Sequence, residues 1–155
     1  MPTRRYLLTQ SAQLAAMLAA AGMLPGLVHA QAAAFNAAAF DAKTMADLMK
    51  ALGGGAPAES KDVTITGPDI AENGAVVPIG ASTALPGVKR MLLMVEKNPS
   101  MLAALFDVTD AVDASFSTRV KRGPSSNVYA VAMMNDGRVL YAQKEIKVTL
   151  GGCGG

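Results

Sequence analysis

The sequence predicts a mainly β protein: an immunoglobulin-like antiparallel β-sandwich with one short N-terminal helix and a flexible C-terminal arm. From residue 62 onward, apolar and polar side chains alternate with period two in short segments, the pattern of strands with one buried face. Clusters of glycine, proline and asparagine separate about seven such segments at spacings of roughly eight to twelve residues, which is typical of a sandwich. Strands and helices do not alternate, so a parallel sheet is not expected.

The helix is expected over residues 41–52, within an alanine-rich lead-in that covers residues 31–61. Apolar side chains recur there at the i, i+3, i+4, i+7 spacing of an amphipathic helix, at Met45, Leu48, Met49 and Leu52. Asp41 is the expected N-cap, with Thr44 in the first turn, and Gly53-Gly54-Gly55 ends the helix. We expect the apolar stripe to pack on the core; docking of a partner is the less favoured interpretation.

The sandwich is expected over residues 62–150, with strands at 62–66, 70–79, 88–96, 101–108, 116–121, 128–134, 138–142 and 145–150. Asn73-Gly74 predicts either a hairpin turn or a bulge within one long strand. Pro78 suits a sheet edge or a strand boundary, because proline has no backbone N–H to donate to a neighbouring strand. The segment 128–134 is apolar on both faces, as expected for a strand that is covered twice. We expect Met91-Leu92-Leu93-Met94 to be core, with packing against a partner as the alternative.

Residues 1–30 have the features of a cleaved export signal. Arg4-Arg5 precedes a long apolar run, and Val28-His29-Ala30 is a small-x-small cleavage pattern, so the leader resembles the twin-arginine type and predicts a periplasmic protein. A permanent membrane anchor is less favoured. The apolar run is near the lower limit of the roughly 17–25 residues that a span needs, and helix-breaking residues interrupt it at Gly22, Pro25 and Gly26.

Composition excludes most catalytic chemistry from the segment that follows the leader. Cleavage after Ala30 would leave 125 of the 155 residues, with twelve basic and twelve acidic side chains, so no basic stripe favours nucleic acid. The one histidine, His29, belongs to the leader, and the chain has one cysteine. A histidine-based triad, a Cys/His zinc site and an internal disulfide are therefore excluded. We expect no cofactor, no metal and no enzymatic activity. Three carboxylates could in principle do acid–base work, but we expect them to line a solvated loop, at Asp107, Asp110 and Asp113.

The lone cysteine, Cys153, lies between two glycine pairs in the C-terminal arm, residues 151–155. Gly151, Gly152, Gly154 and Gly155 leave the backbone unrestrained and slender, so we expect a swinging arm that can enter a narrow channel. An extended chain would carry Cys153 roughly 10 Å beyond the fold. No basic side chain is adjacent in sequence, so we expect the thiol to be poorly reactive until a partner's site activates it.

Other roles for the cysteine remain open at this point. An intermolecular disulfide would make the protein an exported structural or binding sandwich. A buried structural cysteine is disfavoured by the flanking glycines, and a prenylation signal would need three residues after the cysteine. A terminal Gly-Gly also occurs in ubiquitin-like sulfur carriers, but their compact α/β fold differs from the all-β pattern here.

The exported precursor, the sandwich pattern and residues 117–155, STRVKRGPSSNVYAVAMMNDGRVLYAQKEIKVTLGGCGG, together resemble the SoxY family. GGCGG matches the family's terminal motif at every position. The resemblance implies that Cys153 covalently carries sulfur intermediates of thiosulfate oxidation. It also implies a heterodimer with a SoxZ-like β-sandwich subunit that lacks a signal and is co-exported, which would account for a twin-arginine leader on a chain without cofactor ligands.

The resemblance further implies three enzymes that dock on the carrier. A c-type haem enzyme would join thiosulfate to the thiol, a dimanganese hydrolase would remove the terminal sulfonate as sulfate, and a molybdenum–haem dehydrogenase would oxidise the remaining sulfane sulfur.

Overall fold

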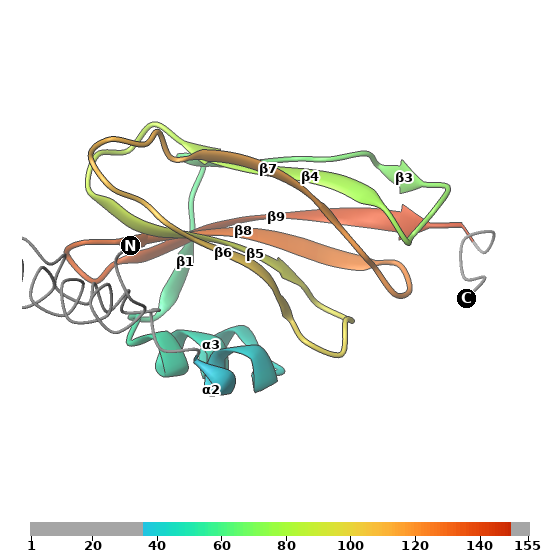
Figure 1. The fold of residues 1–155 in the computed structure, drawn as a ribbon, viewed down its shortest axis with the longest axis horizontal. Coiled ribbons are helices and arrows are strands. Elements are labelled where there is room, and N and C mark those ends of the chain that lie inside the picture. The colour runs from blue at the N-terminus through green and yellow to red at the C-terminus, as the bar shows by residue number, and fades with distance from the viewer. Residues whose placement is uncertain (1–35, 150–155) are drawn as a thin grey trace, which may run out of the picture. The chain divides into compact units, whose positions relative to one another are not determined.

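Two facing β-sheets make up most of the computed structural model, which describes residues 36–149 (Figure 1). The larger sheet has the strand order β1-β9-β8-β5-β6, and β3 pairs with the end of β9; the smaller sheet has the order β2-β4-β7. The strands are β1 (Pro57–Glu59), β2 (Val63–Thr66), β3 (Ile70–Ala71), β4 (Val77–Thr83), β5 (Val88–Val95), β6 (Leu102–Asp107), β7 (Ser115–Val120), β8 (Ser126–Met134) and β9 (Val139–Val148). The predicted immunoglobulin-like sandwich is confirmed.

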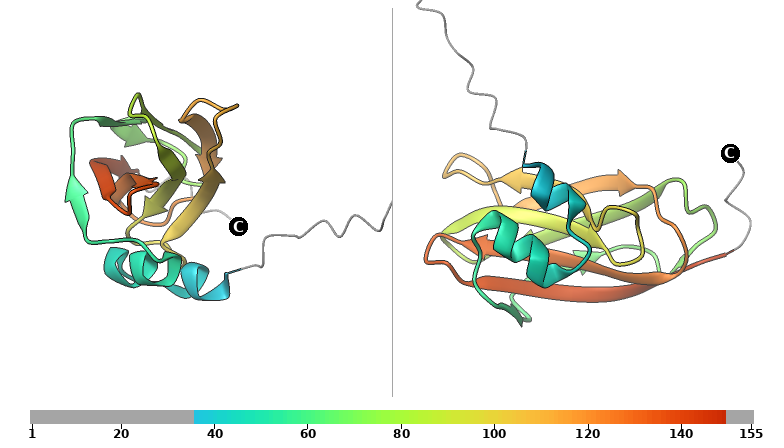
Figure 2. Two further views of the ribbon diagram at one scale, coloured as in Figure 1. Left: turned by 90° about the vertical axis from the view of Figure 1, so that its left-hand side faces the viewer. Right: turned by 90° about the horizontal axis from the view of Figure 1, so that it is seen from below.

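Two short helices, α2 (Ala37–Asp41) and α3 (Met45–Leu52), lie against the outer face of the larger sheet (Figure 2). The predicted helix start was wrong: Asp41 ends α2, and Thr44 is the N-cap of α3. The Thr44 hydroxyl accepts the Asp47 N–H at 3.1 Å and donates to the Asp47 carboxylate at 2.7 Å, so this cap fixes the first turn. The predicted end is confirmed, because Gly53 adopts the left-handed conformation at φ 71°.

Two apolar cores use opposite faces of the larger sheet. Between the sheets, Val77 and Ile79 of β4 pack toward Met91, Leu93 and Val128. Under the helices, the buried side chains of the second core come from α3 and from the other face of the same strands, at Leu48, Met49, Leu92, Met94 and Val131. Strands β5 and β8 are therefore covered on both faces, which confirms the reading of 128–134 and the assignment of Met91–Met94 to the core.

The Asn73-Gly74 segment crosses from one sheet to the other. It forms neither a hairpin turn nor a bulge within one long strand. Ala71 of β3 pairs with Val148 of β9, whereas Val77 pairs with Val120 of β7. A Cβ on Gly74 would lie 3.0 Å from Val148 Cγ1 and 3.1 Å from the Arg122 carbonyl oxygen. The glycine is thus needed for close approach, and the hairpin and bulge predictions were both wrong because tertiary contacts override the local turn signal.

Three further features differ from the sequence-based strand assignment. The segments 138–142 and 145–150 form one continuous strand, β9, and the short strand β1 was not predicted. Both β1 and β3 run parallel to β9, although the longer pairings are antiparallel. The expected place of Pro78 at a strand boundary is confirmed, because it is the second residue of β4, at a point where β7 pairs with it and β2, which reaches only to Gly80, does not.

Candidate functional site

The predicted site residues, Gly151, Gly152, Cys153, Gly154 and Gly155, lie outside the described residues, and so does Leu150. What the structure describes is the place where the arm starts. We call this place the arm root: residues Ile146–Thr149 at the end of β9, together with the groups that hydrogen-bond to them.

Strand β3 holds one side of the arm root. It runs parallel to β9, with Ile70 opposite Lys147 and Ala71 opposite Val148. The Lys147 N–H donates to the Asp69 carbonyl at 2.9 Å, and the Thr149 N–H donates to the Ala71 carbonyl at 3.1 Å. These bonds fix the backbone direction as far as Thr149. Figure 1 shows β3 and the end of β9 at the same end of the sandwich.

The loop before β8 holds the other side of the arm root. The Val148 N–H donates to the Ser125 hydroxyl at 2.8 Å. Val148 also faces the core between the sheets, while Lys147 and Thr149 are exposed. The predicted alternation in this strand is therefore confirmed as far as Thr149.

Arg122 is a buried cation at the arm root, with 2% of its surface exposed. Its guanidinium donates to the Ile146 carbonyl at 3.2 Å, and to the Ser126 carbonyl at 2.8 Å and hydroxyl at 2.9 Å. Its Nε has no acceptor, and it forms no ion pair with a carboxylate among residues 36–149. Loss of hydration lowers the pKa of Arg122. The side chain thus joins β8 to Ile146 of β9, the first residue of the arm root.

An ion pair ties the segment before β3 to β9. Lys144 Nζ lies 2.9 Å from Asp69 Oδ1 and donates to the Gly67 carbonyl at 2.6 Å. The hydrogen bond from Lys144, and then its charge, lower the pKa of Asp69. Because the Asp69 side chain is 89% exposed, this contact orients the segment more than it stabilises the fold.

The carboxylates considered for acid–base work do not converge. Asp107, Asp110 and Asp113 are all exposed at or after the end of β6, and Asp107 accepts a hydrogen bond from Arg90 at 2.6 Å. Within residues 36–149, no three His, Cys, Asp or Glu side chains are grouped to hold a metal ion. No helix in the same range is long and apolar enough to cross a membrane.

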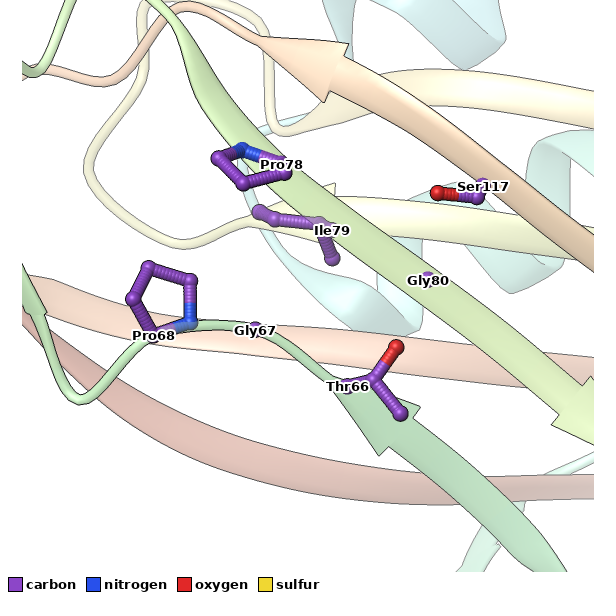
Figure 3. A pocket seen from close by; sticks show the side chains of 7 residues that line it. All are labelled: Thr66, Gly67, Pro68, Pro78, Ile79, Gly80 and Ser117. Carbon is purple, nitrogen blue, oxygen red and sulfur yellow. The ribbon is translucent and has the colours of Figure 1, made fainter.

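A shallow groove of about 310 Å³ crosses the smaller sheet, where β2 leaves β4 (Figure 3). Thr66, Gly80 and Ser117 lie in one cross-strand row, and Pro68 and Pro78 flank it. A Cβ on Gly80 would lie 2.4 Å from Thr66 Oγ1, so the glycine makes room for that side chain. The groove offers hydroxyl and apolar groups, and none of the residues that line it has a titratable side chain that could act as a base.

Sequence reasoning singled out Cys153, which lies outside the described residues and stays a prediction, and it missed the arm root. Arg122 follows Lys121 and precedes a Gly-Pro loop, which is the pattern of an exposed residue. Nothing local signalled that Ser125 and β3 would reach β9, because both contacts join residues far apart in the sequence.

Comparison with known proteins shows which family the chain belongs to. The family model described as sulfur oxidation protein SoxY matches residues 48–153, and no curated protein matches. The solved structure of the sulfur carrier protein SoxY from Chlorobium limicola f thiosulfatophilum is 30% identical, with a TM-score of 0.62; the match covers 70% of this chain and 97% of that one. A superoxide reductase (neelaredoxin) from Ignicoccus hospitalis shares the fold alone, with 18% identity and a TM-score of 0.51 over 56% of this chain and 80% of that one. The chain belongs to the SoxY family of sulfur oxidation proteins.

Proposed function

We propose that this protein is a covalent carrier in thiosulfate oxidation, which presents sulfur adducts of Cys153 to partner enzymes on a swinging C-terminal arm. The observation that carries the proposal is the family match, which extends through Cys153 itself. The solved relative is a sulfur carrier protein, and this chain covers 97% of its length. The hydrogen-bonded arm root supports the proposal, because it gives a tethered thiol a defined point of departure.

The chemistry of such a carrier can be written on the cysteine sulfur. The thiolate and the outer sulfur of thiosulfate form an S–S bond, giving Cys–S–S–SO₃⁻, while two electrons leave to an oxidant, the c-type haem enzyme. Water then attacks the terminal sulfonate; sulfate leaves and Cys–S–SH remains. Oxidation of that outer sulfur to a sulfonate would take three oxygen atoms from water and pass six electrons to a molybdenum–haem dehydrogenase. A second hydrolysis would then release sulfate and return the free thiol. The hydrolase of both cleavages would be a dimanganese enzyme.

Partner enzymes supply the catalytic groups in this proposal, and the carrier is not an enzyme. Beyond the leader the sequence holds no histidine and one cysteine, so it offers neither a nucleophile–base pair nor a metal ligand set of the usual kind. A tether raises the local concentration of the bound intermediate at a docked active site and keeps it from diffusing away. We further propose a heterodimer with a SoxZ-like sandwich subunit, and export to the periplasm through the twin-arginine pathway with cleavage of residues 1–30.

Intact mass spectrometry of the protein from thiosulfate-grown cells tests the proposal. We expect mass additions that correspond to sulfane and thiosulfonate groups, located on Cys153 by peptide mapping. A Cys153→Ser variant, produced at the same level, should carry no adduct and should not support thiosulfate oxidation. Free thiol and disulfide dimer alone, with full activity of the serine variant, would instead show a structural role for the cysteine.

A further inference from the structure

The hydrogen-bonded ladder between β8 and β9 ends inside the arm root. Its last pair joins Ser126, the first residue of β8, to Ile146, and residues 147–149 extend beyond β8. Arg122 lies across this last pair, because its guanidinium donates to the Ile146 carbonyl at 3.2 Å and to the Ser126 carbonyl at 2.8 Å. We call this three-residue contact the Arg122 clamp. Strands fray from the ends of their ladders, so the clamp joins the two strands at the point where β9 would open.

The backbone of Arg122 is itself held, which gives the guanidinium a fixed base. The Asn98 side chain brackets it: Nδ2 donates to the Lys121 carbonyl at 2.8 Å, and Oδ1 accepts the Gly123 N–H at 3.0 Å. The Arg122 N–H donates to the Gly74 carbonyl at 2.7 Å. Asn98 lies in the loop between β5 and β6. The clamp is therefore anchored to a distant part of the larger sheet and to the crossover, and not only to its own loop.

Stability alone does not account for an arginine at this position. The side chain is 2% exposed, and among residues 36–149 it has no carboxylate partner and its Nε has no acceptor. Burial of such a cation offsets much of the gain from its hydrogen bonds, and an apolar side chain of similar volume is often as stable. An apolar side chain cannot bond two carbonyls on two strands in one fixed geometry, as the planar guanidinium does. The residue type therefore points to placement of the end of β9.

We propose that Arg122 is a positioning residue for the reactions at Cys153, because it fixes the residue at which the arm begins and so the length of the tether. The inference rests on the proposed function and deepens it, since it concerns the arm that carries the sulfur adducts. With the clamp closed, the tether begins after Thr149, and Cys153 is four residues further on. With the clamp open, the tether would begin after Ile146, seven residues before the cysteine. The three added residues give roughly 10 Å of extra reach.

A longer tether dilutes the sulfur at an active site that it must enter. The effective concentration of a tethered group falls roughly as the −3/2 power of tether length, once the tether exceeds the span that it must cross. An increase from four to seven residues therefore lowers this concentration about twofold. The step in which a bound enzyme modifies the thiol should slow by the same factor. A small reagent in solution should react equally with the thiol on either tether.

Trypsin cleavage after Lys147 measures the opening of the clamp in the native protein. The N–H groups of Lys147 and Val148 are both hydrogen-bonded in the arm root, so cleavage between these residues requires the end of β9 to leave the sandwich. In Arg122→Met, purified with its partner subunit, the fragment that begins at Val148 should form about tenfold faster than in the wild-type protein. Arg122→Lys keeps a donor for one carbonyl, so it should show an intermediate rate, and it provides the test if the methionine variant does not fold.

Val131→Ala is the control for general loss of stability. Val131 is fully buried in the middle of β8, away from the arm root, and its truncation leaves a cavity in the second core. Trypsin should cut this variant at many sites, without a preference for Lys147, because it opens by unfolding as a whole.

Single-turnover kinetics tests the effect on the reaction. With the enzyme that joins thiosulfate to the thiol in saturating excess, the rate of adduct formation on Arg122→Met should fall about twofold. Insertion of three glycines between Gly151 and Gly152 lengthens the tether equally while the clamp stays intact, so this variant should show the same fall. Alkylation of Cys153 by iodoacetamide should keep the wild-type rate in both variants. Val131→Ala should match the wild-type protein in adduct formation and in alkylation.

Two results would overturn the inference. Cleavage after Lys147 at the wild-type rate in both Arg122 variants would show that other contacts hold the end of β9. An unchanged rate of adduct formation in Arg122→Met, or in the glycine-insertion variant, would show that the length of the tether does not limit the reaction. Failure of the proposed function is distinguishable, because the wild-type carrier would then acquire no adduct on Cys153, while the cleavage pattern would still report whether Arg122 holds β9.

Discussion

Removal of Arg122 tests how the arm root is held. In Arg122→Ala three hydrogen bonds disappear, and the Ser126 hydroxyl and the Ile146 carbonyl lose a charged donor in a buried place. Bonds to charged groups contribute about 1.5–3 kcal/mol each. Against this, a guanidinium without a carboxylate partner costs several kcal/mol to bury, and its Nε has no acceptor. We expect a net loss of about 3 kcal/mol in the free energy of unfolding.

Urea unfolding followed by circular dichroism measures the loss, and Arg119→Ala, an exposed arginine on β7, is the control. Amide hydrogen exchange locates it: Val148 and Thr149 should lose protection in Arg122→Ala before the centre of β8 does. A loss below about 1 kcal/mol, with normal protection at both amides, would refute the view that Arg122 holds the arm root.

Arg122→Lys separates charge from geometry. The ammonium can satisfy fewer of the acceptors, and burial lowers the pKa of a lysine below its ordinary value of about 10.4. A base whose folded pKa is lowered binds fewer protons in the native state, so the stability of this variant should rise as pH increases from its folded pKa toward about 10.4. Burial also lowers the pKa of Arg122 itself, but from an ordinary value far above that of lysine, so the wild-type protein should lack this rise.

Two further predictions concern single residues. Gly53→Ala should lower the free energy of unfolding by about 1 kcal/mol, because Gly53 has φ 71°. No atom lies within 4 Å of an added Cβ, so the change isolates backbone strain. Gly53→Asn should recover part of this stability, and equal thermal midpoints for the wild-type protein and the two variants would contradict the prediction. Lys144 lowers the pKa of Asp69 from 3.8, so their contact should stabilise the fold above pH 3.8 and lose that effect as the pH falls through the lower pKa of the folded state. The Asp69→Asn variant should lack this part of the acid dependence of the free energy of unfolding. Urea unfolding between pH 5 and pH 2 measures it.

Period-two patterning predicted the strands well because one buried face leaves a direct mark on sequence. The strand β5 is apolar on both faces for a different reason, since the smaller sheet covers one face and α2 and α3 cover the other. Asn73-Gly74 shows the limit of local signals. The dipeptide permits a tight turn, but the partner of each flanking strand decides whether a hairpin forms, and those partners are Val148 and Val120.

In the candidate site, too, local sequence predicts one part, and the other part depends on contacts between residues far apart in the chain. Cys153 and its flanking glycines could be proposed from the sequence, because the prediction of a reactive thiol on a flexible arm follows from residue type alone. The arm root depends on contacts across 24 residues from Arg122 to Ile146 and 23 from Ser125 to Val148, which no local pattern encodes.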